Sequence, residues 1–205
     1  MIRIIIIEDQ VILRDSLEKL LDSKEDLQVV ASSGDAEEAL GLCKALSPDL
    51  VLMDVITGDK TSGIAAASRI RIELPRIKII IITALPEITF VEAAKKAGVQ
   101  SFIYKNIKSD VLISTIYNTM DGYSIYPTAS PVKLAFNSSF TDREIAIIRL
   151  VCQTKNRKEI AKTLNISEGT VKASITEILN KTGFDSIMKF AVYAVANGLI
   201  IPQGS

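Results

Sequence analysis

Short apolar runs alternate with longer amphipathic stretches along the first 122 residues. The runs at 4–7 and 79–82 are continuous and β-branched, which is typical of strands buried on both faces of a parallel sheet. The predicted strands are Arg3–Ile7, Leu27–Ser32, Leu50–Met53, Lys78–Thr83 and Ser101–Tyr104. The predicted helices are Val11–Leu21, Ala36–Leu46, Ile64–Leu74, Ile88–Ala97 and Asp110–Met120. Five repeats of strand and helix predict a doubly wound α/β domain with a five-stranded parallel sheet.

The pattern changes after residue 122. Residues 123–139 contain two prolines, several Ser residues and one Asn, and they predict a linker. From residue 140 onward the strand pattern is absent, and the spacing predicts four short helices. Thr141 with Glu144 forms a capping box, and Phe140 with Ile145 forms a hydrophobic staple at the start of the first. We therefore expect a second, small all-α domain over residues 140–205.

Composition narrows the possible functions. Residues 1–122 carry 14 basic and 18 acidic side chains, whereas residues 139–205 carry 9 and 6. A mildly basic second half is compatible with nucleic-acid contact, although many solvated surfaces carry as much charge. The chain has no histidine, which excludes histidine general-base chemistry and a phosphohistidine of its own. The lack of a long apolar run or a signal peptide predicts a cytoplasmic protein that does not bind membranes.

Polar side chains gather where the predicted strands end. Glu8 and Asp9 follow the first strand, Asp54 the third and Lys105 the fifth, and Thr83 ends the fourth. In such sheets ligands bind beyond the carboxyl ends of the strands, so we expect these groups to share one crevice. Three carboxylates repel one another unless a cation lies among them, and oxygen ligands suit Mg²⁺. One such acid alone would more often be a helix cap, but groups at four strand ends favour a phosphoryl-transfer site.

The second half contains a pattern of two helices joined by a tight turn, the second capped by Ser167. Apolar residues of the second helix that should face the core are Val171, Ile175, Ile178 and Leu179. The opposite face, which a recognition helix would present to a DNA major groove, carries Lys172, Ala173, Thr176 and Asn180. From spacing alone, Lys172 could equally be an ordinary solvated lysine. A last helix is predicted at Ile187–Asn197, and it has more apolar residues than one packed face needs. These residues either form a dimer contact or are buried within the domain.

Several segments carry a resemblance to a known family. IIIIEDQ, VLMDV, IIITA and SFIYKN occur in the order and at the spacing of a response-regulator receiver domain, which is flavodoxin-like. The stretch from FTDREIAIIRLV to ITEILNKTG resembles a LuxR-type helix-turn-helix domain. The whole chain therefore resembles the NarL/FixJ class of two-component response regulators, in which these two domains follow one another. The resemblance implies a phosphorylation-controlled regulator of transcription, not an enzyme acting on other substrates.

The resemblance also implies roles for the residues at the strand ends. Asp54 would accept the phosphoryl group from a sensor histidine kinase. Asp9 would bind Mg²⁺ directly together with Asp54 and the backbone carbonyl of Ile56, and Glu8 would bind it through water. The domain would catalyse only its own phosphoryl transfer and slow dephosphorylation.

Three further residues would turn phosphorylation into a signal. Thr83 would hydrogen-bond the acyl phosphate, Lys105 would pair with it, and Phe102 would be the aromatic switch. Phosphorylation would then promote a homodimer that binds double-stranded DNA.

In the second domain, the resemblance assigns phosphate contacts to Lys158 and Thr170. It assigns contacts with base edges to the exposed residues of the recognition helix, Lys172, Ala173 and Thr176.

The sequence departs from the family pattern at a few positions. Thr57-Gly58 replaces the frequent Met-Pro, the loop to Gly63 is one residue longer, and Asn106 follows the lysine. Ser174 stands where His is frequent, and Thr154 where Gly is frequent. We expect the three departures in the first domain to alter the kinetics of phosphorylation. We expect the two in the second domain to alter the operator sequence that the protein prefers.

Two other functions fit the same elements less well. A flavodoxin-type cofactor domain would need a glycine-rich phosphate loop after the first strand, where Glu8 and Asp9 stand instead. An interaction protein whose receiver only dimerises would need no phosphorylation, and a phosphorylation assay separates it from a switch.

Overall fold

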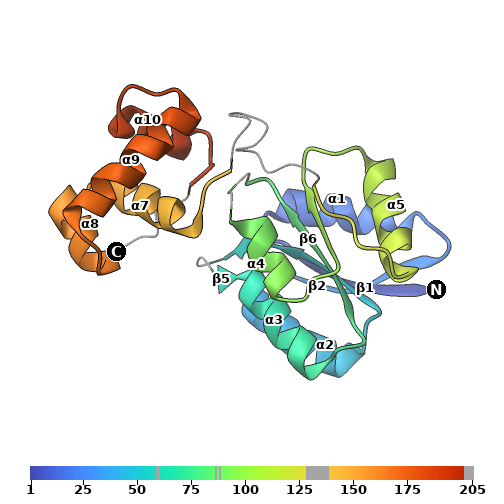
Figure 1. Cartoon of the computed structure of the whole chain (residues 1–205). Helices are drawn as coiled ribbons and strands as arrows, with labels where there is room; N and C mark the ends of the chain where they lie inside the picture. Colours follow the sequence, from blue (N-terminus) through green and yellow to red (C-terminus); the bar gives the residue numbers. More distant parts are fainter. Residues whose placement is uncertain (59–60, 86, 88, 128–138, 201–205) are drawn as a thin grey trace. The chain divides into compact units, whose positions relative to one another are not determined.

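The computed structural model of the chain describes residues 1–58, 61–85, 87, 89–127 and 139–200. Contacts divide the chain into two compact units: Met1–Ala84 with Thr89–Pro127, and Leu85–Ile88 with Thr128–Ser205. The first unit is α/β and the second is helical (Figure 1). Among the described residues, no helix combines the length and the hydrophobicity that crossing a membrane requires.

A five-stranded parallel sheet with the order β2-β1-β3-β6-β7 forms the centre of the first unit. Its strands are β1 (Ile2–Ile7), β2 (Leu27–Ser33), β3 (Leu50–Asp54), β6 (Lys78–Thr83) and β7 (Ser101–Tyr104). The predicted strands and the doubly wound fold class are thus confirmed, with shifts of at most one residue at the strand ends.

Successive residues of the central strands point to opposite faces of the sheet, and both faces are covered by helices. Ile5 and Ile7 of β1 belong to one buried cluster, beneath α2 (Ala39–Leu46), α3 (Gly63–Glu73) and α4 (Phe90–Lys96). Ile4 and Ile6 belong to the other, beneath α1 (Val11–Asp22) and α5 (Ser109–Met120). Figure 1 shows these two helical layers on either side of the sheet. This double burial explains why the strands read as continuous apolar runs.

Helices α3 and α5 begin one residue before the prediction, and two other helices differ from it by more. The stretch expected as one helix from Ala36 starts with a 3-10 turn, η1 (Ala36–Glu38), before α2. Asp35 caps this turn, because its side chain accepts a hydrogen bond from the N–H of Glu37. Helix α4 begins at Phe90, two residues after the predicted start at Ile88, which lies outside the described residues.

The loop after β3 contains a small antiparallel pair that the sequence did not predict. It consists of β4 (Ile56–Thr57) and β5 (Thr61–Ser62), and it leads directly into α3. Gly58 adopts a left-handed conformation with φ of +44° after β4, which glycine tolerates without steric cost.

The first residues of the predicted linker pack on the first unit. The N–H of Phe102 in β7 donates to the carbonyl of Ile125 at 2.8 Å, and the N–H of Ile125 donates to Ser101 Oγ at 3.1 Å. The hydroxyl of Tyr126 donates to the carbonyl of Val99 at 2.5 Å. Residues 125–126 therefore line the outer edge of β7, and the linker residues 128–138 lie outside the described part.

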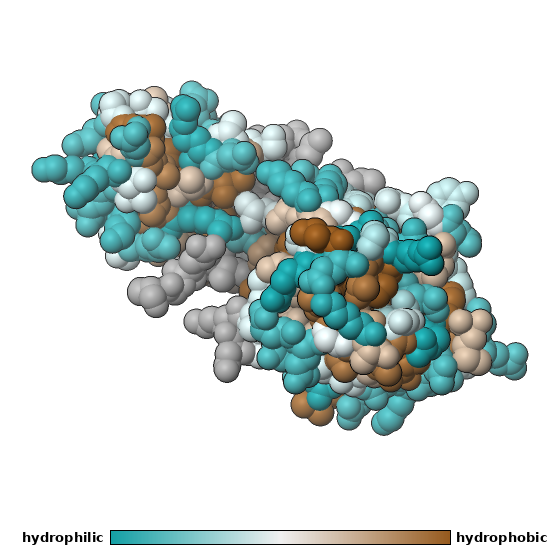
Figure 2. Space-filling view, turned by 90° about the horizontal axis from the view of Figure 1, so that it is seen from below, coloured by the Kyte–Doolittle hydropathy of each residue, from teal (hydrophilic) through white to brown (hydrophobic). Residues whose placement is uncertain are grey.

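The second unit contains four described helices: α7 (Asp142–Cys152), α8 (Arg157–Leu164), α9 (Glu168–Thr182) and α10 (Ile187–Ala196). Thr141 and Glu144 form the predicted capping box of α7. A second capping box, not predicted, joins Asn156 and Glu159 at the start of α8. One apolar cluster, drawn from all four helices, forms the core of this unit. Figure 2 shows one face of the whole chain, where hydrophilic residues cover much of the surface and hydrophobic residues show between them.

Candidate functional site

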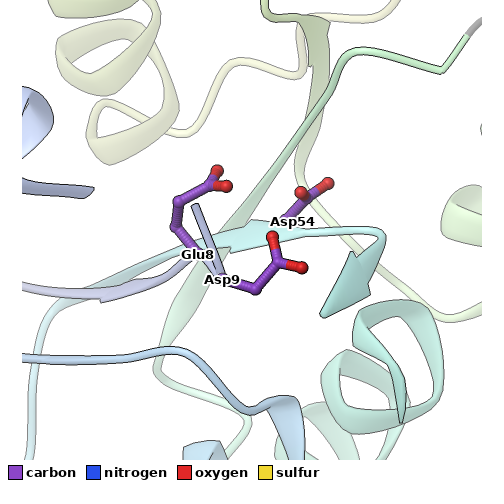
Figure 3. A group of neighbouring side chains, drawn as sticks. All are labelled: Glu8, Asp9 and Asp54. Carbon is purple, nitrogen blue, oxygen red and sulfur yellow. The ribbon is translucent and has the colours of Figure 1, made fainter. Parts of the chain in front are cut away.

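Three carboxylates meet at the carboxyl ends of β1 and β3. One oxygen from each of Glu8, Asp9 and Asp54 can be chosen so that all three lie within 4.8 Å of one another. Figure 3 shows the three side chains converging on a shared space. Glu8 is 0% exposed and Asp54 is 6% exposed, whereas Asp9 is exposed. The structure therefore brings together the acids that the sequence placed at separate strand ends.

The sheet register explains this convergence. β1 and β3 are parallel neighbours, and Ile7 is paired with Met53, so the residues that follow them emerge side by side. Glu8 is also held from the other side, because its N–H donates to the carbonyl of Ser33 at 2.9 Å. Its carbonyl accepts a 2.6 Å hydrogen bond from Arg14, a contact that no sequence pattern predicted.

Lys105 inserts a positive charge between two of the acids. Its Nζ lies 2.7 Å from Asp54 Oδ2 and 2.7 Å from Glu8 Oε2, and its side chain is largely buried. Its N–H donates to the carbonyl of Thr83 at 2.8 Å, which fixes the chain where it leaves β7. Burial by itself would lower the pKa of Lys105, but the hydrogen bonds to Asp54 and Glu8 outweigh it and raise that pKa. Lys105 is therefore a charged ammonium at neutral pH.

Despite the nearby Lys105, the carboxyl groups of Asp54 and Glu8 ionise less readily than they would in water. Burial raises the pKa of Asp54 above its ordinary value, and the hydrogen bond from Lys105 only partly opposes it. Burial likewise raises the pKa of Glu8, and the negative charge of Asp54 adds to the effect. A hard divalent cation with oxygen ligands would relieve this repulsion, so the donor set fits Mg²⁺.

Thr83 and Phe102 occupy the neighbouring strands. Thr83 is the last residue of β6 and is buried, one position beyond Ile82, which is paired with Asp54. Phe102 is also fully buried, and its ring meets that of Tyr104 edge-on at 5.6 Å between centroids. Thr83 thus lies on the strand next to β3, and Phe102 lies on β7, one strand further out. The phenyl ring of Phe102 belongs to the cluster beneath α3 and α4.

Gly63 packs directly on the predicted phosphoacceptor. A Cβ at this position would lie 1.8 Å from the carbonyl oxygen of Asp54 and 2.9 Å from Met53 Cγ. The N–H of Gly63 donates to the carbonyl of Val55 at 2.8 Å. Ile56, whose carbonyl is predicted to bind the metal ion, lies in β4, between Val55 and Gly63 in the chain. It is half-buried. Only glycine can bring α3 this close to Asp54.

The second unit presents the predicted DNA-contact residues on its two central helices. Lys158 is exposed on α8, and α9 exposes Lys172, Ala173 and Thr176. Thr170 is half-buried, and its N–H donates to the capping Ser167 Oγ at 3.0 Å. Thr176 uses its hydroxyl internally, as a donor to the carbonyl of Lys172 at 3.1 Å.

The opposite face of α9 is buried, as predicted. Val171, Ile175 and Ile178 lie in the core, and Leu179 packs against it. Lys181 extends from the same helix to Glu144 and lies 2.8 and 2.7 Å from the two carboxylate oxygens. This ion pair, which the sequence did not predict, ties α9 to the start of α7.

Comparison with known proteins divides the chain at similar places. Residues 4–117 match the family of response regulator receiver domains, and residues 138–194 match the luxR family of bacterial regulatory proteins. The transcriptional regulatory protein LnrK of Bacillus subtilis is 28% identical over 220 residues, covering 98% of this chain and all of LnrK. The response regulator protein VraR of Staphylococcus aureus is 28% identical over 207 residues, covering 97% of this chain and 99% of VraR.

A solved structure shares the fold across both units. The structure of two RcsB dimers bound to two parallel DNAs has a TM-score of 0.70 and 19% sequence identity. The match covers 97% of this chain and 99% of that one.

Proposed function

Since the chain belongs to the response regulators, with a receiver domain and a LuxR-type DNA-binding domain, we propose that a phosphoryl group on Asp54 controls how it binds DNA. The observation that carries this proposal is the position of Asp54 between two further acids and the Lys105 ammonium. Residues 1–122 would accept the phosphoryl group, 140–205 would bind DNA, and 123–139 would link them.

The phosphoryl donor is a sensor histidine kinase. A carboxylate oxygen of Asp54 attacks phosphorus, a P–O bond forms and the P–N bond to the kinase histidine breaks. The leaving imidazole keeps the electron pair and takes up a proton. Because this chain has no histidine, the donor belongs to another molecule. Slow attack of water on the same phosphorus would release inorganic phosphate and reset the protein.

Asp9, Asp54 and the carbonyl of Ile56 would hold Mg²⁺, with Glu8 acting through a water molecule. A bound Mg²⁺ offsets the charges of the carboxylates and of the phosphoryl oxygens. Lys105 pairs with a phosphoryl oxygen, and because it already lies 2.7 Å from Asp54 Oδ2 it needs little movement to do so.

Thr83 and Phe102 convert the chemical change into a structural one. The Thr83 hydroxyl moves to the phosphoryl group, and Phe102 occupies the space that it leaves. The resulting surface pairs with a second copy of the chain, so that a homodimer binds DNA. Dimers on DNA are described for RcsB, which shares this fold.

Lys158 and Thr170 would contact DNA phosphates, and Lys172, Ala173 and Thr176 would contact base edges. Support comes from their places on α8 and α9, where all but the half-buried Thr170 are exposed while the apolar residues of α9 face the core. A helix of this kind fits the DNA major groove with one face free. A protein that binds bacterial DNA in this way would act in the cytoplasm.

The direct test is phosphorylation by a small phosphodonor. The wild type, incubated with Mg²⁺ and acetyl phosphate, should gain one phosphoryl group by intact mass, and removal of Mg²⁺ should abolish the gain. Asp54→Asn should gain none, whereas Asp15→Asn, at an exposed position of α1, should behave like the wild type. A wild type that gains no mass, or an Asp54→Asn variant that does, would refute the assignment.

A further inference from the structure

The hairpin after β3 is held in place by a chain of side-chain hydrogen bonds. Thr57 in β4 is fully buried, and its Oγ1 accepts a 2.9 Å hydrogen bond from the N–H of Ala36. Thr57 Oγ1 also lies 2.8 Å from Thr61 Oγ1 in β5. Thr61 Oγ1 in turn lies 3.0 Å from Asp35 Oδ1, on the same segment as Ala36.

One direction of donation satisfies all three contacts, and Thr61 Oγ1 also lies 3.0 Å from the backbone carbonyl of Thr57, a second acceptor within the hairpin. A hydroxyl carries a single proton, and a carboxylate only accepts. When Thr61 donates to Asp35, its oxygen is free to accept from Thr57, whose oxygen accepts from Ala36. Every hydroxyl then donates once and accepts once, so the four groups form a closed relay from the Ala36 N–H to the Asp35 carboxylate. Such chains strengthen each bond along them.

The segment that anchors this relay also contacts the acidic pair. The carbonyl of Ser33 accepts from the N–H of Glu8, and a Cβ on Gly34 would lie 3.7 Å from Asp9 Cα. Residues 33–36 therefore touch the chain at Glu8 and Asp9 on one side and the hairpin on the other. This segment therefore connects the acidic pair to the hairpin that carries Ile56.

We propose that Thr57 and Thr61 are positioning residues for the Mg²⁺ site, holding the carbonyl of Ile56 at a set distance from Asp9 and Asp54. The inference rests on the proposed function, in which these three groups bind the ion. Mg²⁺ requires near-ideal octahedral geometry, so a ligand carried on a loose loop binds it poorly. Gly58, at φ of +44°, has no side chain that could hold the loop, whereas the Thr57 and Thr61 hydroxyl groups bond it to residues 35–36.

Mg²⁺ affinity, measured by isothermal titration calorimetry with the full chain and MgCl₂, tests the proposal. Thr57→Val keeps the branched shape and removes the hydroxyl, and it should weaken binding about 10-fold or more, as lost outer-shell contacts do. Thr57→Ser keeps the hydroxyl and should stay within about 2-fold of the wild type. Thr61→Val removes a hydroxyl from the middle of the relay at a less buried position. It should weaken Mg²⁺ binding as well, and it tests the proposal if Thr57→Val does not fold.

Thr115→Val is the matched control, because Thr115 is a buried threonine of α5 whose hydroxyl bonds the carbonyl of Val111. It should leave the Mg²⁺ affinity unchanged. Wild-type binding that is lost in Asp9→Asn but kept in Thr57→Val and Thr61→Val overturns this inference alone. Equal losses in Thr57→Ser and Thr57→Val overturn it as well. A wild type that binds no Mg²⁺, or binds it equally with Asp9→Asn, overturns the metal assignment itself and the inference with it.

Discussion

The Nζ atom of Lys105 lies 2.7 Å from Oδ2 of Asp54, across the space between the ends of β7 and β3. It lies equally close to Glu8, so one ammonium group compensates two buried carboxylates. Removing one partner from a buried ion pair leaves the other charge uncompensated, which costs far more than the pair contributes. The apo protein should therefore depend on Lys105 for stability as well as for chemistry.

Lys105→Met should lower the free energy of unfolding by about 3 kcal/mol at pH 7. Without the lysine, the pKa values of Asp54 and Glu8 rise further above their unfolded values. The loss should therefore be full well above those pKa values and should vanish as the pH falls below about 4, where the acids are protonated in both states. Urea unfolding at pH 7 and at about pH 3 measures this loss, with Lys96→Met on the exposed surface of α4 as the control. Equal losses at the two pH values would show that carboxylate charge is not the cause.

Gly63→Ala should disturb the phosphorylation site through the backbone. The added methyl group would lie 1.8 Å from the Asp54 carbonyl oxygen, so α3 or the end of β3 must shift. We expect a loss of about 1–3 kcal/mol in urea unfolding and slower phosphorylation of Asp54 by acetyl phosphate. Gly41→Ala is the control, because nothing lies within 4 Å of its Cβ and helix α2 should gain about 0.5–1 kcal/mol. A Gly63→Ala variant with wild-type stability and rate would contradict the expected backbone shift.

Glu144→Gln should destabilise the second unit in a pH-dependent way. Burial alone would raise the pKa of Glu144, but hydrogen bonds from Lys181 and Thr141 outweigh it and hold that pKa below its ordinary 4.5. The carboxylate therefore stabilises the fold above pH 4.5, and this contribution is lost as the pH falls through the lowered value. The variant should lose about 1–3 kcal/mol at pH 7 and much less at pH 3, measured by denaturant unfolding. A difference that does not change with pH would exclude the ion pair as its source.

Thr83→Ala should separate phosphorylation from its consequence. The variant keeps the acids and Lys105, so intact mass should still show one phosphoryl group on Asp54. Without the hydroxyl, the phosphoryl group has less preference for the active state, and most of the gain in DNA affinity should disappear. Even a 10-fold gain corresponds to only about 1.4 kcal/mol, so one lost hydrogen bond can remove it. Thr83→Ser should retain the gain; a full gain in Thr83→Ala would exclude this route.

Lys172→Ala and Lys158→Ala should differ in their effect on DNA binding. A lysine that contacts a base edge affects specific DNA most, so Lys172→Ala should cost about 1–3 kcal/mol on a selected site and little on random DNA. A lysine that contacts a phosphate affects both DNAs alike, so Lys158→Ala should weaken both and reduce the salt dependence. Fluorescence anisotropy with both DNAs at several salt concentrations distinguishes them. Equal losses on both DNAs for Lys172→Ala would make it a backbone contact.

Much of the fold could be predicted because local and global signals agree. The runs at 4–7 and 79–82 are buried on both faces, and Thr141 with Glu144 caps α7 as its spacing predicts. The strand-end residues could be found because parallel neighbours bring their carboxyl ends together. The whole acidic site follows from that rule.

The parts that could not be predicted depend on contacts between distant segments. The β4–β5 hairpin is only two residues long on each strand, and Thr57 is held by Ala36, 21 residues earlier in the chain. The extension of residues 125–126 along the sheet has no periodic signal, since its partners are Val99, Ser101 and Phe102. Composition marks that stretch as a linker because hydrogen bonds to residues 24 and 27 positions away leave no local pattern in the sequence.

Ile125 also closes one edge of the sheet. An edge strand with free N–H and C=O groups is a template on which another chain can add a strand, and long exposed edges favour aggregation. At β7 the N–H of Phe102 is already taken by the Ile125 carbonyl, so an incoming strand would first have to displace residues 125–126. The sheet therefore ends at β7, and the N–H of Phe102 is not open to strand addition.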